Sequence, residues 1–275
     1  MKDFYRRFKS KLKKLVKNDP FERQLLKAAK LPRYTKGEID WSGRSFKFID
    51  SNSFTWIYDE VFKRHIYRFE SDVESPVIID CGANIGVSII YFKKLYPKAK
   101  VTAFEPDNQV FDYLNFNVKS FNLEDVKLIN KGLWKEETEL VFFSEGADAN
   151  RIMSDNEKLI KDNNQYHKTT IKTVKLSEYI RESVDFLKID IEGAETDVIL
   201  EAKDKLHLVR NIFIEYHSFV DRPQTLNEIL DVLSETGFRY YMDIPVSLTN
   251  QPFVHRGSFL SMDLLVNIYA YRTSH

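Results

Sequence analysis

The chain has 275 residues, and its 41 lysines and arginines balance 41 aspartates and glutamates, so the formal net charge is zero. This length suits one α/β domain with a short extension, and the charge balance gives no reason to expect a nucleic-acid partner. A single cysteine excludes an intramolecular disulfide and predicts a reducing, cytoplasmic location. The sequence lacks an apolar run of about 18 residues and a signal-peptide core, so we expect neither a membrane span nor secretion by that route.

The first 20 residues carry eight basic side chains against two acidic ones. Apolar side chains recur at helical spacing in this segment and predict a basic amphipathic helix: Phe4, Phe8, Leu12, Leu15 and Val16. Such a helix either docks on the domain through its apolar face or lies on the anionic inner face of a membrane. The sequence leaves both alternatives open. We divide the chain into a basic helical extension, residues 1–38, and a main domain, residues 39–275.

Strand-like and helix-like segments alternate through the main domain. The predicted strands are a hairpin over Ile39–Ile49, a strand from Val77 to Asp80, Val101–Phe104, Val126–Asn130, Leu133–Phe143, Thr169–Val174, Phe186–Asp190, Asn211–Tyr216, Phe238–Asp243 and Leu264–Tyr271. The predicted helices are Thr55–Arg64, a segment between Gly86 and Pro97, Asn108–Phe121, Leu176–Arg181 and Pro223–Thr236. This alternation predicts an α/β fold with a doubly wound, mostly parallel sheet and an antiparallel C-terminal strand pair. Ligands of such sheets bind at the carboxyl ends of the strands.

A glycine-containing turn follows the first strand of this predicted sheet, in the segment VIIDCGANIG from Val77 to Gly86. Its glycines let the backbone approach a ligand closely, and Glu105, at the end of the next strand, can accept hydrogen bonds from two ribose hydroxyls. Asn84 and Val87 stand where a dinucleotide fingerprint has its second and third glycines. The turn therefore predicts a nucleoside ligand without a pyrophosphate.

The pattern Asp80-x-Gly82-x-x-x-Gly86 resembles motif I of the class I S-adenosylmethionine (SAM) methyltransferases, which share a Rossmann-like fold. Together with AFEPD at 103–107, FLKIDIEGAE at 186–195 and IEYH at 214–217, it resembles the FkbM family of methyltransferases. The resemblance implies that SAM is the cofactor and that a hydroxyl of a sugar or a polyketide-like product is methylated. The candidate cofactor-binding residues are Asp80, Gly82, Ala83, Asn84, Gly86, Glu105 and, near the adenine, Gly132.

Methyl transfer to an alcohol requires the donor and the acceptor to be held in line and a proton to be removed. His217, placed just beyond the fifth sheet strand, is the first candidate for the general base, with Asp190 and Glu192 in support. The alternatives are that His217 is a surface histidine or supports a site residue from behind, and that the two carboxylates cap the next helix. His167 and His255 lie in loops and are the reserve candidates.

Asp190, Glu215 and His217 form an oxygen and nitrogen set at two adjacent strand ends that suits Mg²⁺, Mn²⁺ or Ca²⁺. Strand alternation places Glu215 and His217 on one face, which allows joint ligation without requiring it, and we do not expect metal dependence. We predict a SAM-dependent O-methyltransferase that acts on a sugar or glycan precursor. The alternatives are a metal-dependent O-methyltransferase of a small phenol or polyketide-like metabolite, and a SAM-binding or partner-binding protein without catalysis.

Overall fold

The structure is a computed structural model that describes residues 19–144, 151–152, 167–246, 249, 251, 253–254 and 261–272. Residues 1–18 lie outside this part, so docking and membrane contact of the N-terminal helix both stay predictions. Among the described residues, no helix is both long enough and apolar enough to cross a membrane.

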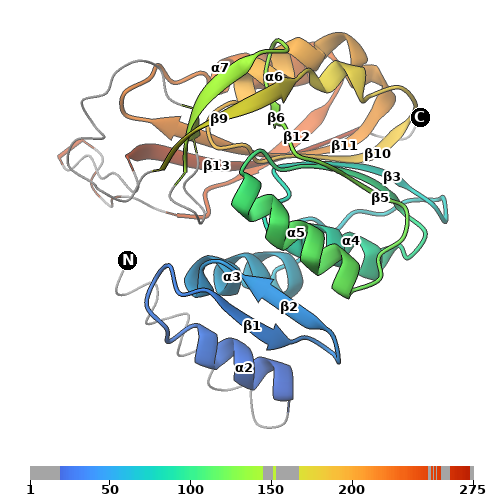
Figure 1. Cartoon of the computed structure of the whole chain (residues 1–275). Helices are drawn as coiled ribbons and strands as arrows, with labels where there is room; N and C mark the ends of the chain where they lie inside the picture. The colour runs from blue at the N-terminus through green and yellow to red at the C-terminus, as the bar shows by residue number, and fades with distance from the viewer. Residues whose placement is uncertain are drawn as a thin grey trace.

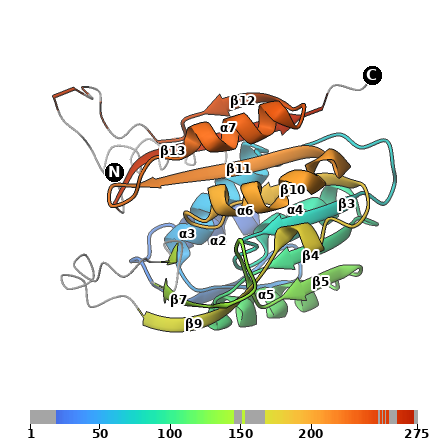
Figure 2. The ribbon, with the colours of Figure 1, turned by 90° about the horizontal axis from the view of Figure 1, so that it is seen from above.

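Seven strands form the central sheet: β3 (Val77–Cys81), β4 (Lys100–Phe104), β5 (Val126–Ile129), β10 (Val184–Ile189), β11 (Val209–Phe219), β12 (Arg239–Asp243) and β13 (Met262–Tyr271). Their order is β12-β13-β11-β10-β3-β4-β5, from one edge of Figure 2 to the other. Strands β11, β10, β3, β4 and β5 are parallel, whereas β13 is antiparallel to β11 and β12. The predicted sheet, with its antiparallel C-terminal pair, is confirmed.

Helices cover both faces of this sheet (Figure 1). On one face lie α4 (Val87–Leu95) and α5 (Asn108–Ser120), and on the other lie α6 (Glu195–Ala202) and α7 (Leu226–Glu235), with the short 3₁₀ turns η3 (Leu176–Glu178) and η4 (Lys203–Leu208). Successive residues of β11 therefore point to opposite faces. Phe213 belongs to the core beneath α4, and Ile214 belongs to the core beneath α6. Each side of the sheet therefore has its own hydrophobic core.

An N-terminal layer packs outside α4 and α5 (Figure 1). It comprises α2 (Pro20–Ala28), β1 (Gly37–Asp40), β2 (Ser45–Phe48), α3 (Ser51–Tyr58) and a π-helical turn, η1 (Asp59–Lys63). The ring of Phe21 on α2 stacks on Trp41 with 5.0 Å between ring centroids, so α2 shares the core of the main domain. The predicted hairpin is confirmed. The predicted helix begins earlier than expected, at Ser51, because the Asp50 carboxylate caps it by accepting the Asn52 N–H at 3.2 Å.

A second sheet contains β6 (Gly132–Leu133), β7 (Glu139–Ser144), β8 (Arg151–Ile152) and β9 (His167–Val174), in the order β6-β9-β7-β8. The strand predicted over Leu133–Phe143 is divided into β6 and β7, and the polar residues Lys135, Glu136 and Glu137, at which we expect a break, lie between them. The Thr173 hydroxyl of β9 holds the turn between them by donating to the Glu136 carbonyl at 2.8 Å and accepting the Thr138 N–H at 3.0 Å.

The predicted end of the fifth parallel strand is also wrong. Strand β11 continues to Phe219, because β13 pairs with it as far as the partners Phe219 and Met262. His217 thus lies within the strand and not beyond it, with its backbone fixed on one side by β13.

Candidate active site

The glycine turn joins β3 to α4 at the carboxyl edge of the sheet. Gly82 and Gly86 have φ angles of +91° and +92°, in the left-handed region that favours glycine. A Cβ atom on Gly82 would lie 1.9 Å from the carbonyl oxygen of Asp190, at the end of β10. Gly82 is therefore required for the close contact between the turn and β10. This is a second reason for a glycine here, besides the predicted close approach of a ligand.

Glu105 follows the end of β4 and faces this turn. Its carboxylate accepts the N–H groups of Asn84 at 3.1 Å and Asp107 at 2.9 Å, one on each oxygen. Burial raises the pKa of Glu105 to about 8. Because each carboxylate oxygen can accept two hydrogen bonds, each keeps one acceptor position for a ribose hydroxyl.

Two other predicted cofactor residues are buried among neighbouring side chains. Asp80 is fully buried, and its carboxylate accepts the Ser88 hydroxyl at 2.5 Å. Gly132 is buried in β6, where an added Cβ would lie 2.9 Å from Ile171 and 3.7 Å from the side chain of Pro106. Gly132 therefore lies next to Pro106, the residue after Glu105. Asp80 instead holds the start of α4, through its hydrogen bond with Ser88.

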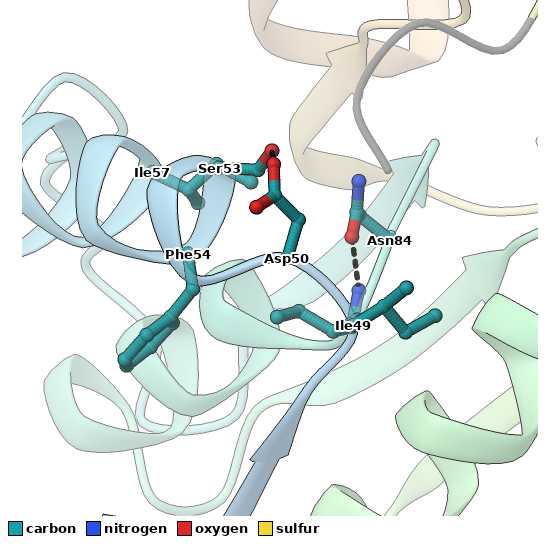
Figure 3. A pocket seen from close by; sticks show the side chains of 7 residues that line it. Ile49, Asp50, Ser53, Phe54, Ile57 and Asn84 are labelled. Carbon is teal, nitrogen blue, oxygen red and sulfur yellow. Dashed lines mark hydrogen bonds between the residues drawn. The ribbon is translucent and has the colours of Figure 1, made fainter. Parts of the chain in front are cut away.

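A small hollow lies beside the glycine turn (Figure 3). It is lined by Ile49, Asp50, Ser53, Phe54, Ile57, Asn84 and Ile85. The Asn84 amide oxygen accepts the Ile85 N–H at 2.7 Å, and Ser53 donates to Asp50 at 2.7 Å. The N-terminal layer thus forms a wall on one side of the turn.

Lys188 of β10 ties the turn to the adjacent strand end, a role that the sequence analysis missed. Its ammonium donates to the Gly82 carbonyl at 2.7 Å and lies 3.4 Å from Asp80 and 3.1 Å from Asp190. Burial opposes its charge, but Asp190 and Asp80 outweigh burial and raise the pKa of Lys188. A lysine within the apolar run FLKI was the available signal, because a buried lysine requires charged partners.

His217 is held from one side by Glu195, the first residue of α6. The buried Glu195 carboxylate accepts the backbone N–H groups of Gly193 at 2.9 Å and Ile191 at 3.2 Å, and its Oε1 lies 3.0 Å from His217 Nδ1. Glu195 therefore holds the turn before α6 through two backbone N–H groups and also fixes the orientation of the His217 ring.

The other ring nitrogen of His217 faces two further carboxylates. Nε2 lies 3.6 Å from Glu192 and 3.5 Å from Glu215, and the His217 side chain is only 3% exposed. Burial alone would lower the pKa of His217, but Glu192 and Glu195 raise it well above its usual value. The surrounding carboxylates thus favour the charged imidazolium, and His217 is a buried side chain and not a surface histidine.

This charge state bears on the choice of general base, because an imidazolium has no free position for a proton. Glu192, next to Nε2, is 26% exposed, and burial raises its pKa well above the ordinary carboxyl range. Glu192 is also the more exposed of the two side chains, so it is better placed than His217 to meet an acceptor at this edge. The backbone of the reserve candidate His167 is described, but its side chain is not, and His255 lies outside the described residues.

One group of potential metal ligands differs from the predicted set in one member. Within the described residues, Asp190, Glu192 and His217 place one potential ligand atom each within 4.8 Å of one another. Cis ligands of an octahedral ion are about 3 Å apart, so a small adjustment would bring these three atoms around a divalent ion. This set contains Glu192 where the predicted set has Glu215, and Glu215 also lies 3.5 Å from His217 Nε2, so the predicted set stays a prediction.

Glu60 contributes a further carboxyl to this edge from the π-helical turn, and the sequence analysis missed it. Its Oε1 accepts from Arg64 at 3.3 Å. Burial, together with the charges of Glu215 and Asp190, raises the pKa of Glu60 to about 8. A π-helical turn often marks a functional site, but it has no simple sequence signature.

The elevated pKa of Glu60 predicts a pH-dependent stability. A carboxyl whose folded pKa exceeds its unfolded value of 4.5 stabilises the fold fully below pH 4.5, and this contribution is lost as the pH rises to about 8. As the pH rises from 4.5 to about 8, the free energy of unfolding of Glu60→Gln should therefore rise, relative to that of wild type, by on the order of 2–4 kcal/mol. Urea unfolding across this pH range measures the gain. Glu124→Gln, at an exposed position, is the control, and parallel curves for Glu60→Gln and wild type would contradict the prediction.

The strand ends fit SAM by the chemistry of their side chains. Glu105 and Asn84 offer acceptors for a ribose beside the turn, and Asp190, Glu192 and Glu215 stay 17–26% exposed at the same edge. The acidic groups there outnumber the buried cations Lys188 and His217, and a ligand with positive sulfonium and ammonium groups would favour their ionised form. The fold and this edge therefore define a class I methyltransferase.

Residues 80–240 match the model of the methyltransferase FkbM domain, so the chain belongs to the FkbM methyltransferase family. It is 30% identical over 191 residues to methyltransferase sdnD of Sordaria araneosa, covering 58% of this chain and 73% of the relative. It is 26% identical over 174 residues to 2-O-methyltransferase NoeI of Sinorhizobium fredii, covering 58% and 71%. The crystal structure of methyltransferase FkbM from Methylobacillus flagellatus KT superposes with a TM-score of 0.50 at 16% identity, covering 76% and 46%, which shows the common fold.

The chain is therefore a SAM-dependent methyltransferase. The alternative of a binding protein without catalysis is set aside. Family membership confirms the cofactor that the glycine turn and Glu105 predicted, whereas the individual roles of the site residues stay predictions.

Loss of the Glu105 carboxylate should weaken SAM binding. Glu105→Ala removes the acceptor for the ribose hydroxyls, which should cost about 1.5–3 kcal/mol, or roughly a tenfold to hundredfold loss of affinity. Isothermal titration with SAM measures this loss, and Glu124→Ala, at an exposed position, is the control. Wild-type affinity in Glu105→Ala would remove Glu105 from the cofactor site.

Proposed function

We propose that this enzyme transfers the methyl group of SAM to a hydroxyl of a sugar or a glycan precursor. The observation that carries the proposal is the pairing of Glu192 with the buried His217 imidazolium at the carboxyl edge, next to the glycine turn. An alcohol is a poor nucleophile until its proton is removed, so a proton acceptor beside the cofactor suits a hydroxyl acceptor. One relative, 2-O-methyltransferase NoeI, supports an oxygen acceptor, and a sugar is one of the acceptor classes that the FkbM resemblance implies.

When bound, SAM supplies a methyl group that is already activated by the sulfonium charge. Glu192 accepts the hydroxyl proton of the acceptor at its carboxylate, and His217 holds that carboxylate by charge at 3.6 Å. Glu195 fixes the His217 ring through Nδ1, so the imidazolium keeps one orientation. Lys188 fixes Asp190 and the glycine turn relative to each other, which sets the spacing between cofactor and acceptor.

Methylation of a panel of mono- and oligosaccharides by SAM, followed by mass spectrometry, tests this function. We expect a mass gain of one methyl group on a hydroxyl, and Glu192→Gln should lose most of the turnover while it retains SAM affinity. Methylation of amines or of RNA, with none on the sugars, would contradict the proposal. Full turnover by Glu192→Gln would remove Glu192 from its proposed role.

A second candidate function is a metal-dependent O-methyltransferase of a small phenol or polyketide-like metabolite. It is favoured by one observation, the grouping of Asp190, Glu192 and His217 within 4.8 Å. The chemistry of these donors suits Mg²⁺ or Mn²⁺. Dialysis against EDTA distinguishes the two candidates. Unchanged turnover supports the metal-free reaction, whereas a loss that only added Mg²⁺ or Mn²⁺ reverses assigns these residues to an ion.

A further inference from the structure

Strand β12 leaves one edge of the central sheet open. It is the terminal strand in the sheet order, and its described partners are all on β13. Three large side chains of this strand are exposed although they are apolar or aromatic, namely Tyr240 at 37%, Tyr241 at 63% and Met242 at 41%. Figure 2 shows β12 at the top edge of the sheet, with β13 and then β11 below it in the view.

Natural proteins usually protect such an edge with lysine, proline, a bulge or a covering segment. Strand β12 reads RYYMD and contains neither lysine nor proline. Its pairing with β13 is regular, without a register shift, from Arg239 to Asp243. Within the described part of the chain, no backbone group outside β13 bonds to it. The charged residues of β12, Arg239 and Asp243, are of opposite sign, so this edge suits an added strand whose charges are complementary to them.

The sequence of β12 is complementary to itself when it is read in the opposite direction. An antiparallel pair of two β12 strands with Tyr241 opposite Tyr241 places Arg239 of each copy opposite Asp243 of the other. Strand alternation puts these two Arg–Asp pairs and the Tyr241 pair on one face, and Tyr240 opposite Met242 on the other. The Asp243 side chain is 44% exposed. Among the described residues its nearest cation is Arg64, which is as far away as 4.0 Å, so Asp243 can form a closer pair with another cation.

We propose that β12 is a dimer interface, at which two copies of this chain pair antiparallel about a twofold axis through Tyr241. The central sheets of the two copies then join edge to edge into one continuous sheet. A second copy is the favoured occupant because charge complementarity at both ends of the strand fixes the register. A shift by one residue would place Arg239 opposite Met242 and would move every side chain to the other face. A twofold contact of one patch with itself is also the commonest form of homodimer.

Reversal of charge at the two ends of β12 tests the interface. By symmetry, Arg239→Asp creates two Asp–Asp contacts, and Asp243→Arg creates two Arg–Arg contacts. Each single variant should raise the dimer dissociation constant by about tenfold or more, whereas Arg239→Asp combined with Asp243→Arg should restore it to within about threefold of wild type. Sedimentation equilibrium of the full chain measures these constants. The control is Lys98→Asp, which reverses an exposed ion pair with Glu74 and should not change the dimer.

Melting temperatures of all variants show whether each one folds, and the restored double variant separates a broken interface from a damaged fold. Three results would overturn the proposal. The first is a wild-type chain that stays monomeric at about 100 µM, the range where weak dimers form. The second is a dimer that Arg239→Asp leaves unchanged. The third is a double variant that dissociates as readily as the single ones, which would assign the edge to another occupant.

Discussion

His217→Ala is expected to lower turnover by up to roughly 10² to 10⁴, the contribution of the proton-transfer group that His217 positions, Glu192. Affinity for SAM should stay nearly unchanged, because the glycine turn and Glu105 are separate from His217. The loss has two sources. The Glu192 carboxylate is no longer beside a positive charge, and the hydrogen-bonded orientation set by Glu195 disappears. Steady-state kinetics with SAM and a methylated acceptor measures the effect.

A matched histidine provides the control for this prediction. His207 is an exposed histidine that contacts the Asp204 carbonyl, away from the strand ends, so His207→Ala should turn over normally. The pH dependence of turnover adds a second readout, since removal of the imidazolium changes the ionisation of Glu192. Near-normal turnover in a folded His217→Ala variant would leave His217 with a structural role only and would show that Glu192 does not need its charge.

Gly82→Ala is expected to have the largest effect on stability. The new Cβ would lie 1.9 Å from the Asp190 carbonyl oxygen, a backbone atom that cannot move without displacing the end of β10. We expect a loss of more than about 4 kcal/mol in free energy of unfolding, which is exceptional for a single substitution. Urea unfolding monitored by circular dichroism, or the failure to obtain folded protein, measures this loss.

Gly43→Ala is a close control, because Gly43 also has a left-handed backbone, with φ +80°, but no atom lies within 4 Å of its added Cβ. This variant should lose only about 1–2 kcal/mol in free energy of unfolding, which is the cost of a left-handed backbone for an L residue. The difference between the two variants isolates the collision with β10. Equal losses would show that the backbone angle alone explains the glycine, and that the turn does not touch Asp190 as described.

Local signals in the sequence predicted the sheet and the glycine turn. A run of β-branched residues before Asp80 marks a buried parallel strand wherever it occurs, and the left-handed angles at Gly82 and Gly86 require glycine. The hairpin over residues 39–49 was likewise predictable from alternation and a turn. Strand ends were less predictable, because the length of β11 depends on pairing with β13, far along the chain.

The chemistry of the site was only partly predictable, because it depends on contacts between distant elements. His217 and Glu192 stood out as titratable residues at strand ends, but the charge on His217 follows from the placement of Glu195 and Glu192 around its ring. Lys188 and Glu60 were missed for the same reason. The Lys188 ammonium finds Asp80 and the Gly82 carbonyl at the end of another strand, and Glu60 lies in a π-helical turn. The sequence alone does not show these contacts or this turn.

The central claim is that SAM binds at the carboxyl ends of β3 and β4, next to the carboxylates that follow β10. Hydrogen exchange of the backbone amides with and without S-adenosylhomocysteine, followed by mass spectrometry, tests it most directly. We predict slower exchange in peptides that contain residues 81–86, 104–107 and 190–193, and little change in β1, β2 and β12. Saturating ligand that leaves the exchange of residues 81–86 and 104–107 unchanged, or that protects a different part of the chain, would contradict this account.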